Sequence, residues 1–202
     1  MTASSRPLEW SASGRPLPGE PESGDIAVCV EGGEHTVVAV IDGLGHGTEA
    51  AEAASRVRDV IVRQPDQPVE MLLSLAHEAL ARTRGAAVTI ASIDDRGTMR
   101  WVGVGNVEGL VLRLDGHRPR RAASATLYGG VVGYRLPRTR VSTVALEPGD
   151  VVVMATDGIT PDFADDVALG SPIDRLVSTI LDRSARPNDD ALVAAVRYGG
   201  RP

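Results

Sequence analysis

The chain contains the stretch Val37-Val38-Ala39-Val40-Ile41-Asp42-Gly43-Leu44-Gly45-His46-Gly47, in which five apolar residues run directly into an aspartate and three alternating glycines. The apolar run predicts a buried strand, and the glycines predict a tight turn before a helical pattern that opens at Thr48. An aspartate at the end of a buried strand, beside glycine backbone that another group can approach closely, is typical of a metal ligand or a phosphate contact. A capping role at the helix start is the alternative, and the setting of the other acidic residues distinguishes the two.

Composition limits the class of protein. A length of 202 residues fits one domain, which we expect over residues 1–202. The net charge of −6 argues against nucleic acid as a partner. The single cysteine, Cys29, excludes an internal disulfide and fits a reducing compartment. No apolar run reaches the roughly 18 residues of a membrane span, and residues 1–9 lack a signal-peptide pattern. We therefore expect a cytoplasmic protein without a membrane partner.

The order of elements predicts an α+β fold. Apolar periodicity and turn signals predict strands over residues 26–30, 35–41, 87–93, 99–104, 109–114, 141–145, 151–155 and 192–196, and helices over residues 48–63, 68–83 and 172–184. Gly85 is the expected C-terminal cap of the second helix, and Ser171 is the expected N-cap of the third. Residues 1–22 predict a largely irregular segment, and residues 119–137 predict a long loop with one short strand. Two packed sheets with helices on the outside are the simplest arrangement of these elements.

Aspartates recur at the ends of the predicted strands. The hairpin of residues 26–30 and 35–41 places Asp25 and Asp42 at one edge of a sheet. Asp157 follows the apolar run 151–155, and Asn188-Asp189-Asp190 directly precedes the last apolar run. If these carboxylates converge, cations must offset their repulsion. Oxygen ligands without a Cys or His set select hard ions, namely Mg²⁺ or Mn²⁺.

These motifs, in this order, resemble the PPM-type metal-dependent serine/threonine phosphatases of the protein phosphatase 2C superfamily. They are Ser23-Gly24-Asp25, Asp42-Gly43-Leu44-Gly45-His46-Gly47, Thr156-Asp157-Gly158 and Asn188-Asp189-Asp190. Within the SpoIIE-like branch, the short stand-alone chain most resembles RsbX-like serine phosphatases. The resemblance implies a four-layer αββα sandwich, in which two mostly antiparallel sheets are flanked by helices. It also implies hydrolysis of a phosphoserine or phosphothreonine monoester by a water that two Mn²⁺ or Mg²⁺ ions activate.

The resemblance assigns roles to particular residues. Asp42 is implied to bridge the two metal ions, and the Gly43 carbonyl to serve the second. Asp157 and Asp189 are implied to hold the first ion. Asp25 is implied to support the second ion through coordinated water. Asp42 and Asp157 would then be the catalytic residues, because they act through the metal-activated water.

Three further residues are candidates for the same site. Asp190 is either an additional ligand or a residue that supports Asp189. Arg15 is either a phosphate contact or a surface arginine. In animal-type members a histidine directly follows the Asp-Gly pair, but here Leu44 stands at that position and His46 comes two residues later. His46 is therefore either a general acid or a residue of the turn before the helix.

The resemblance also implies a partner. RsbX-like phosphatases act on small STAS-domain antagonist proteins in partner-switching pathways that control sigma factors or stress responses. The expected substrate is therefore a phosphorylated STAS-domain protein. The alternative is a non-catalytic scaffold or partner-binding module that keeps the fold.

Overall fold

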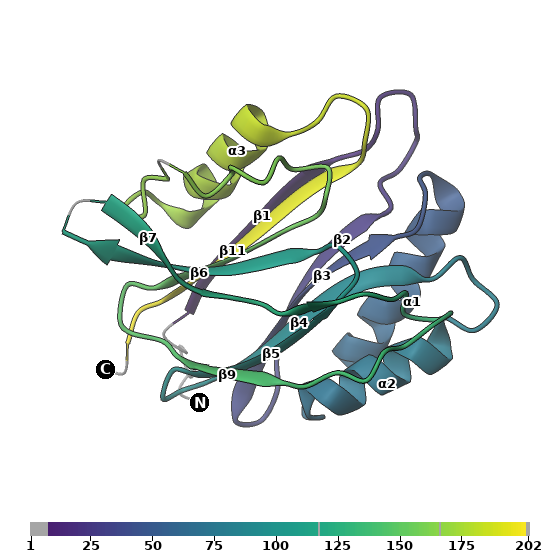
Figure 1. Cartoon of the computed structure of the whole chain (residues 1–202), viewed down its shortest axis with the longest axis horizontal. Helices are drawn as coiled ribbons and strands as arrows, with labels where there is room; N and C mark the ends of the chain where they lie inside the picture. Colours follow the sequence, from purple (N-terminus) through teal and green to yellow (C-terminus); the bar gives the residue numbers. More distant parts are fainter. Residues whose placement is uncertain (1–7, 117, 166, 201–202) are drawn as a thin grey trace, which may run out of the picture.

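The computed structural model describes residues 8–116, 118–165 and 167–200. The strands in these residues form two sheets that lie face to face, with helices on the outer faces (Figure 1). The predicted α+β fold and its αββα layering are confirmed. No helix in the described ranges is long and apolar enough to cross a membrane.

The first sheet has five strands. Their spatial order is β1 (Leu8–Arg15), β11 (Ala191–Tyr198), β10 (Val151–Ala155), β6 (Glu108–Asp115) and β7 (Arg118–Ser124). All neighbours in this sheet pair antiparallel. The helix α3 (Ile173–Ser184) packs on β1 and β11 and covers the outer face there.

The second sheet has six strands. Their order is β2 (Asp25–Glu31), β3 (His35–Gly43), β4 (Ala86–Asp94), β5 (Thr98–Val104) and β8 (Leu127–Tyr128), with β9 (Ser142–Ala145) also paired to β5. The pairing is antiparallel except between β5 and β8. The outer face carries α1 (Thr48–Arg63) over β2 and β3, and α2 (Val69–Ala79) over β4 and β5.

The central strands are apolar throughout because both of their faces are covered. In β3, Val37 and Ile41 pack toward the helices α1 and α2, whereas Val38 and Val40 pack toward the opposite sheet. The same alternation occurs in β10 and β11, whose side chains divide between the core beneath α3 and the core between the sheets. A continuous apolar run beside an aspartate therefore indicates a central strand, with the aspartate at the end of that strand.

The irregular segment predicted for residues 1–22 is wrong for Leu8–Arg15, which form β1. This edge strand pairs with β11 from Leu8↔Tyr198 to Arg15↔Ala191. This backbone pairing and the packing of α3 hold the strand in place, whereas its Trp10 is 46% exposed. Polar and glycine residues on a half-exposed edge strand give no strand pattern in the sequence.

The long loop with one short strand predicted for residues 119–137 is wrong in part, because the segment contains two strands rather than one. The segment begins with the edge strand β7, which pairs with β6 across a register shift between Val111 and Leu112, and it continues into β8. Two helix ends also differ from the prediction. The helix α2 ends at Ala79, so Gly85 lies beyond its cap, and Thr83 instead bonds the Leu80 carbonyl. The N-cap of α3 is Pro172 rather than Ser171.

Candidate functional site

Five aspartates meet where strands of both sheets end, and we call them the acidic edge: Asp25, Asp42, Asp157, Asp189 and Asp190. Asp25 opens β2 directly opposite Asp42 near the end of β3, as the hairpin predicted. Asp157 lies two residues after β10, and the other two aspartates directly precede β11, its antiparallel partner. Each sheet therefore contributes carboxylates from a pair of antiparallel strands.

A threonine joins the two sheets at this edge. The Thr156 hydroxyl donates to Asp25 Oδ2 over 2.7 Å and accepts a hydrogen bond from the Leu192 backbone N–H over 3.0 Å. Both bonds are buried. A buried hydroxyl that is fully bonded in this way fixes the position of the Asp25 carboxylate relative to β11.

The carboxylates repel one another across the acidic edge. Asp25 is only 7% exposed, and burial, followed by the charge of Asp42, raises its pKa from 3.8 to about 8. Burial, followed by the charges of Asp157 and Asp189, raises the pKa of Asp42 from 3.8 to about 7. Burial and Asp157 also raise the pKa of Asp189. Burial and like charge act in the same direction, so the site disfavours its own ionised form.

Positive side chains do little to balance this charge. Ion pairs between described residues do not include any aspartate of the acidic edge. Arg186 lowers the pKa of Asp189, but only as the weakest of five contributions. In the described ranges, no three His, Cys, Asp or Glu side chains are grouped closely enough to hold one metal ion. The oxygen donors suit hard divalent cations that take the rest of their ligands from water or backbone carbonyls.

The structure separates the roles of the adjacent aspartates Asp189 and Asp190. Asp190 is 4% exposed, and its two carboxylate oxygens accept the backbone N–H groups of Leu17 and Gly24 over 2.6 and 2.8 Å. It therefore ties down the loop between β1 and β2 that leads into Asp25. Asp189 is more exposed, and its Oδ1 accepts only the adjacent backbone N–H of Asp190. Of the two carboxylates, that of Asp189 is the more available to a ligand.

The glycines that follow Asp42 and Asp157 allow close backbone contacts. A Cβ atom on Gly43 would lie 2.1 Å from the Ala50 carbonyl oxygen in α1. A Cβ atom on Gly158 would lie 1.8 Å from the Asp190 carbonyl oxygen. Both distances are far below van der Waals contact, so only glycine fits. The Asp-Gly pairs thus bring α1 and the start of β11 against the acidic edge.

Asn106 belongs to this site although the sequence assigned it no role. Its Nδ2 atom donates to Asp157 Oδ2 over 2.6 Å, and its hydrogen bonding also lowers the pKa of Asp42. It lies in the turn between β5 and β6, directly after Gly105. The amide is a neutral donor among carboxylates, where it stabilises the ionised form. The stretch Val102-Gly103-Val104-Gly105-Asn106-Val107 resembles the RsbX-like group, but this resemblance assigned Asn106 no role, and a Gly-Asn turn is too common to identify one by itself.

Arg15 and His46 lie beside the acidic edge but have other contacts. The Arg15 guanidinium donates to the Arg186 backbone carbonyl, in the loop before Asp189. The His46 Nδ1 atom lies 2.7 Å from Glu20 Oε1, and the imidazole is more than half exposed. His46 thus joins the turn before α1 to the loop before β2, and the described contacts do not link it to the aspartates.

An αββα sandwich that gathers aspartates at one edge of both sheets is the fold of PP2C-type proteins. The chain belongs to the family described as Stage II sporulation protein E (SpoIIE), whose family model matches residues 32–199. The resemblance to the SpoIIE-like branch that the motifs indicated is thereby confirmed.

Relatives and solved structures agree with this assignment. Phosphoserine phosphatase RsbX from Bacillus subtilis (strain 168) is 24% identical over 157 residues, which cover 76% of each chain. A chain from a structural study of the bacterial stressosome superposes with a TM-score of 0.83 at 25% identity, covering 94% of this chain and 99% of the other. RsbX in complex with magnesium superposes with a TM-score of 0.80 at 20% identity, covering 94% of both chains.

Proposed function

We propose that this protein is a metal-dependent phosphoserine/phosphothreonine protein phosphatase of the cytoplasm. The observation that carries the proposal is the acidic edge, where carboxylates from both sheets repel one another and form no ion pair with an arginine among the described residues. Such an arrangement costs stability and has a function only if cations bind there. The relative named phosphoserine phosphatase RsbX, and the magnesium complex solved for RsbX, support this reading.

The proposed ligands are those that the resemblance to PPM-type phosphatases implies. Asp42, Asp157 and Asp189 would hold one Mg²⁺ or Mn²⁺ ion, and Asp25 and the Gly43 carbonyl would serve a second. Binding would have to draw these carboxylates closer together, since in the described ranges no three of them are grouped closely enough to hold one ion. Such ions would neutralise phosphate charge and supply an acidified water.

Neighbouring residues would hold these groups in place. Asn106 orients Asp157, Thr156 orients Asp25, and Asp190 fixes the loop that leads into Asp25. The described contacts give His46 no direct part in the proposed reaction.

The proposed substrate is a phosphorylated STAS-domain protein in a partner-switching stress or sigma-factor pathway. The similarity to RsbX and to a chain from the bacterial stressosome supports this class of substrate. The net charge of −6 agrees with a protein rather than a nucleic acid as the partner.

The test is hydrolysis of p-nitrophenyl phosphate and of a phosphoserine peptide with MnCl₂, with MgCl₂ or with EDTA. We expect hydrolysis with at least one of the metals and none with EDTA. Asp157→Asn should reduce kcat by at least a hundredfold, since it removes the negative charge of a proposed metal ligand. Glu147→Gln, which changes an exposed carboxylate that pairs with Arg113, is the matched control and should retain activity. Absence of hydrolysis with every metal and substrate would favour the scaffold alternative.

A further inference from the structure

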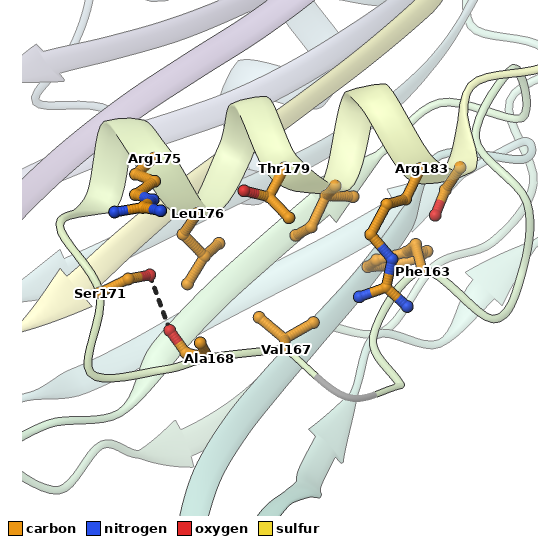
Figure 2. A pocket seen from close by; sticks show the side chains of 10 residues that line it. Phe163, Val167, Ala168, Ser171, Arg175, Leu176, Thr179 and Arg183 are labelled. Atoms are coloured by element: carbon orange, nitrogen blue, oxygen red, sulfur yellow. Dashed lines mark hydrogen bonds between the residues drawn. The ribbon is translucent and has the colours of Figure 1, made fainter.

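A pocket lies between α3 and the loop that precedes it, outside the acidic edge (Figure 2). Its volume is about 280 Å³. The inner wall is apolar and is formed by Phe163, Val167, Leu176 and Ile180, each no more than 8% exposed. An apolar recess of this kind takes up one apolar side chain of a ligand.

Two arginines stand at opposite ends of the pocket. Arg175, Thr179 and Arg183 recur every four residues and therefore form one stripe of α3 that faces the opening, as Figure 2 shows. Asp174 and Asp182 lie one position before the arginines, on a neighbouring stripe of the helix, and do not line the pocket. The opening is therefore cationic although the helix as a whole carries both signs of charge.

The residues that the structure describes form few contacts that neutralise this positive charge. Neither Arg175 nor Arg183 forms an ion pair of 4.0 Å or less with another described residue, although Arg183 lowers the pKa of the exposed Asp162. The far side of the same loop faces Arg118, Arg120 and Arg121 of β7, of which Arg120 and Arg121 pair with Asp115 and Asp165. The charge that favours an anionic partner is therefore that of Arg175 and Arg183 at the opening itself.

The pocket adjoins the acidic edge through the backbone. Ser184 lines the pocket, and its carbonyl accepts a hydrogen bond from the Thr160 N–H over 2.8 Å. The next turn is fixed by the Arg186 N–H, which donates to the Gly158 carbonyl over 2.7 Å. Gly158 directly follows Asp157, so two backbone hydrogen bonds connect the C-terminal end of the pocket to the segment that carries this aspartate.

We propose that this pocket docks an extended acidic segment of the phosphoprotein substrate, at a distance from its phosphorylated residue. Eight helical residues separate the two arginines, which corresponds to about 12 Å at 1.5 Å per residue. An extended segment spans that length in about four residues and presents alternate side chains on one face. The matching segment has an acidic residue at each end and an apolar residue at the centre, in the pattern acidic–x–apolar–x–acidic. This inference rests on the proposed phosphatase function for the identity of the partner.

Binding is tested without reference to catalysis. A fluorescently labelled peptide, Gly-Ser-Glu-Ser-Leu-Ser-Glu-Ser-Gly, is titrated with the protein in EDTA and followed by anisotropy. We expect saturable binding that weakens at least tenfold when glycine replaces the central leucine or lysines replace the glutamates. Arg175→Glu/Arg183→Glu should weaken binding at least tenfold, and so should Thr179→Phe, which fills the pocket without a change in charge.

The matched control is Arg56→Glu/Arg63→Glu in α1, which changes the net charge equally on a different face. It should bind the peptide like the wild type, and thermal unfolding checks that all variants are folded. Equal binding by the wild type and both pocket variants would overturn the proposal. Binding of decanoate at this pocket without any binding of the peptide would also overturn it, because the ligand would then be a small amphipathic anion.

A second arm separates this inference from the proposed function. Phosphoserine peptides are joined to the acidic segment by Gly-Ser linkers of several lengths. Their KM and kcat are compared with those of peptides in which glycine replaces the central leucine of the acidic segment. We expect KM to fall at least fivefold at the best linker length, with kcat unchanged, and the gain to vanish in Arg175→Glu/Arg183→Glu. Hydrolysis of all peptides with equal KM would contradict docking and leave the phosphatase function standing. Peptide binding at the pocket without hydrolysis of any phosphopeptide would contradict the phosphatase function and with it the identity of the partner.

Discussion

Replacing Asp42 with asparagine is expected to stabilise the metal-free protein at neutral pH and to weaken its response to divalent cations. Burial and the neighbouring carboxylates raise the pKa of Asp42 from 3.8 to about 7, so the folded chain keeps a proton that the unfolded chain releases. A raised carboxyl pKa favours the folded state at low pH, and this stabilisation is lost as the pH rises from about 4 toward 7. Asparagine does not titrate, so the variant avoids the loss.

The expected size follows from the pKa shift. Between pH 5 and pH 7, each pH unit corresponds to about 1.4 kcal/mol for a group that is protonated only in the folded state. The wild type should therefore lose on the order of 3 kcal/mol of stability relative to Asp42→Asn over this range. For a chain of this length, that difference corresponds to roughly 6 to 12 °C in Tm. Asp25 is present in both proteins. Loss of the Asp42 charge lowers the raised pKa of Asp25, which further stabilises the variant relative to the wild type at neutral pH.

The assay is thermal unfolding of both proteins at pH 5 and pH 7.5, first in EDTA and then with excess MgCl₂. In EDTA, the Tm of the wild type should fall relative to that of the variant as the pH increases. MgCl₂ at pH 7.5 should raise the Tm of the wild type, because cations bind only the folded state, and should raise that of the variant much less. Parallel pH dependence of the two proteins in EDTA, or an equal response to MgCl₂, would refute the reasoning.

Three further substitutions test other parts of the structure. Arg113→Ala leaves the carboxylate of Asp150, which is 1% exposed, without its two guanidinium hydrogen bonds, and should lower the free energy of unfolding in urea by about 3 kcal/mol. Gly158→Ala places a methyl group 1.8 Å from a backbone carbonyl and should destabilise the fold by at least about 3 kcal/mol, whereas Gly170→Ala meets nothing within 4 Å and should change the midpoint little. Asn106→Leu removes a donor to the acidic edge and should lower kcat about tenfold with Tm nearly unchanged, and a normal kcat would exclude a positioning role.

The sequence predicted the central strands and the edge strand β2, but it missed the edge strands β1 and β7, for one physical reason. Val151–Ala155 are buried on both faces, so apolar composition alone predicts the strand. Leu8–Arg15 and Arg118–Ser124 each have a single neighbouring strand and expose much of their surface. Their strand conformation depends on backbone hydrogen bonds to β11 and β6, which no local pattern of side chains records.

A similar distinction separates the site residues that the sequence predicted from those it missed. The aspartates at strand ends were conspicuous because an acid directly beside a buried apolar run is unusual. Asn106 and Thr156 act on carboxylates that are 51 and 131 residues away in the sequence, and small polar residues in turns are common. The role of Asp190 also depended on the fold, because its partners Leu17 and Gly24 lie in a loop that only the pairing of β1 with β11 brings close.

The acidic edge depends on both sheets, and this dependence links stability to the proposed function. Asp25 and Asp42 come from the sheet that carries α1, whereas Asp157 and Asp189 come from the sheet that carries α3. The Thr156 hydroxyl and the carboxylate of Asp190 hold the two halves together with hydrogen bonds, while repulsion between the carboxylates opposes that contact. Cations that bind between the halves would turn this repulsion into attraction. The metal-loaded protein should therefore resist separation of the sheets more than the metal-free protein, with the largest gain in hydrogen-exchange protection at the ends of β2, β3, β10 and β11.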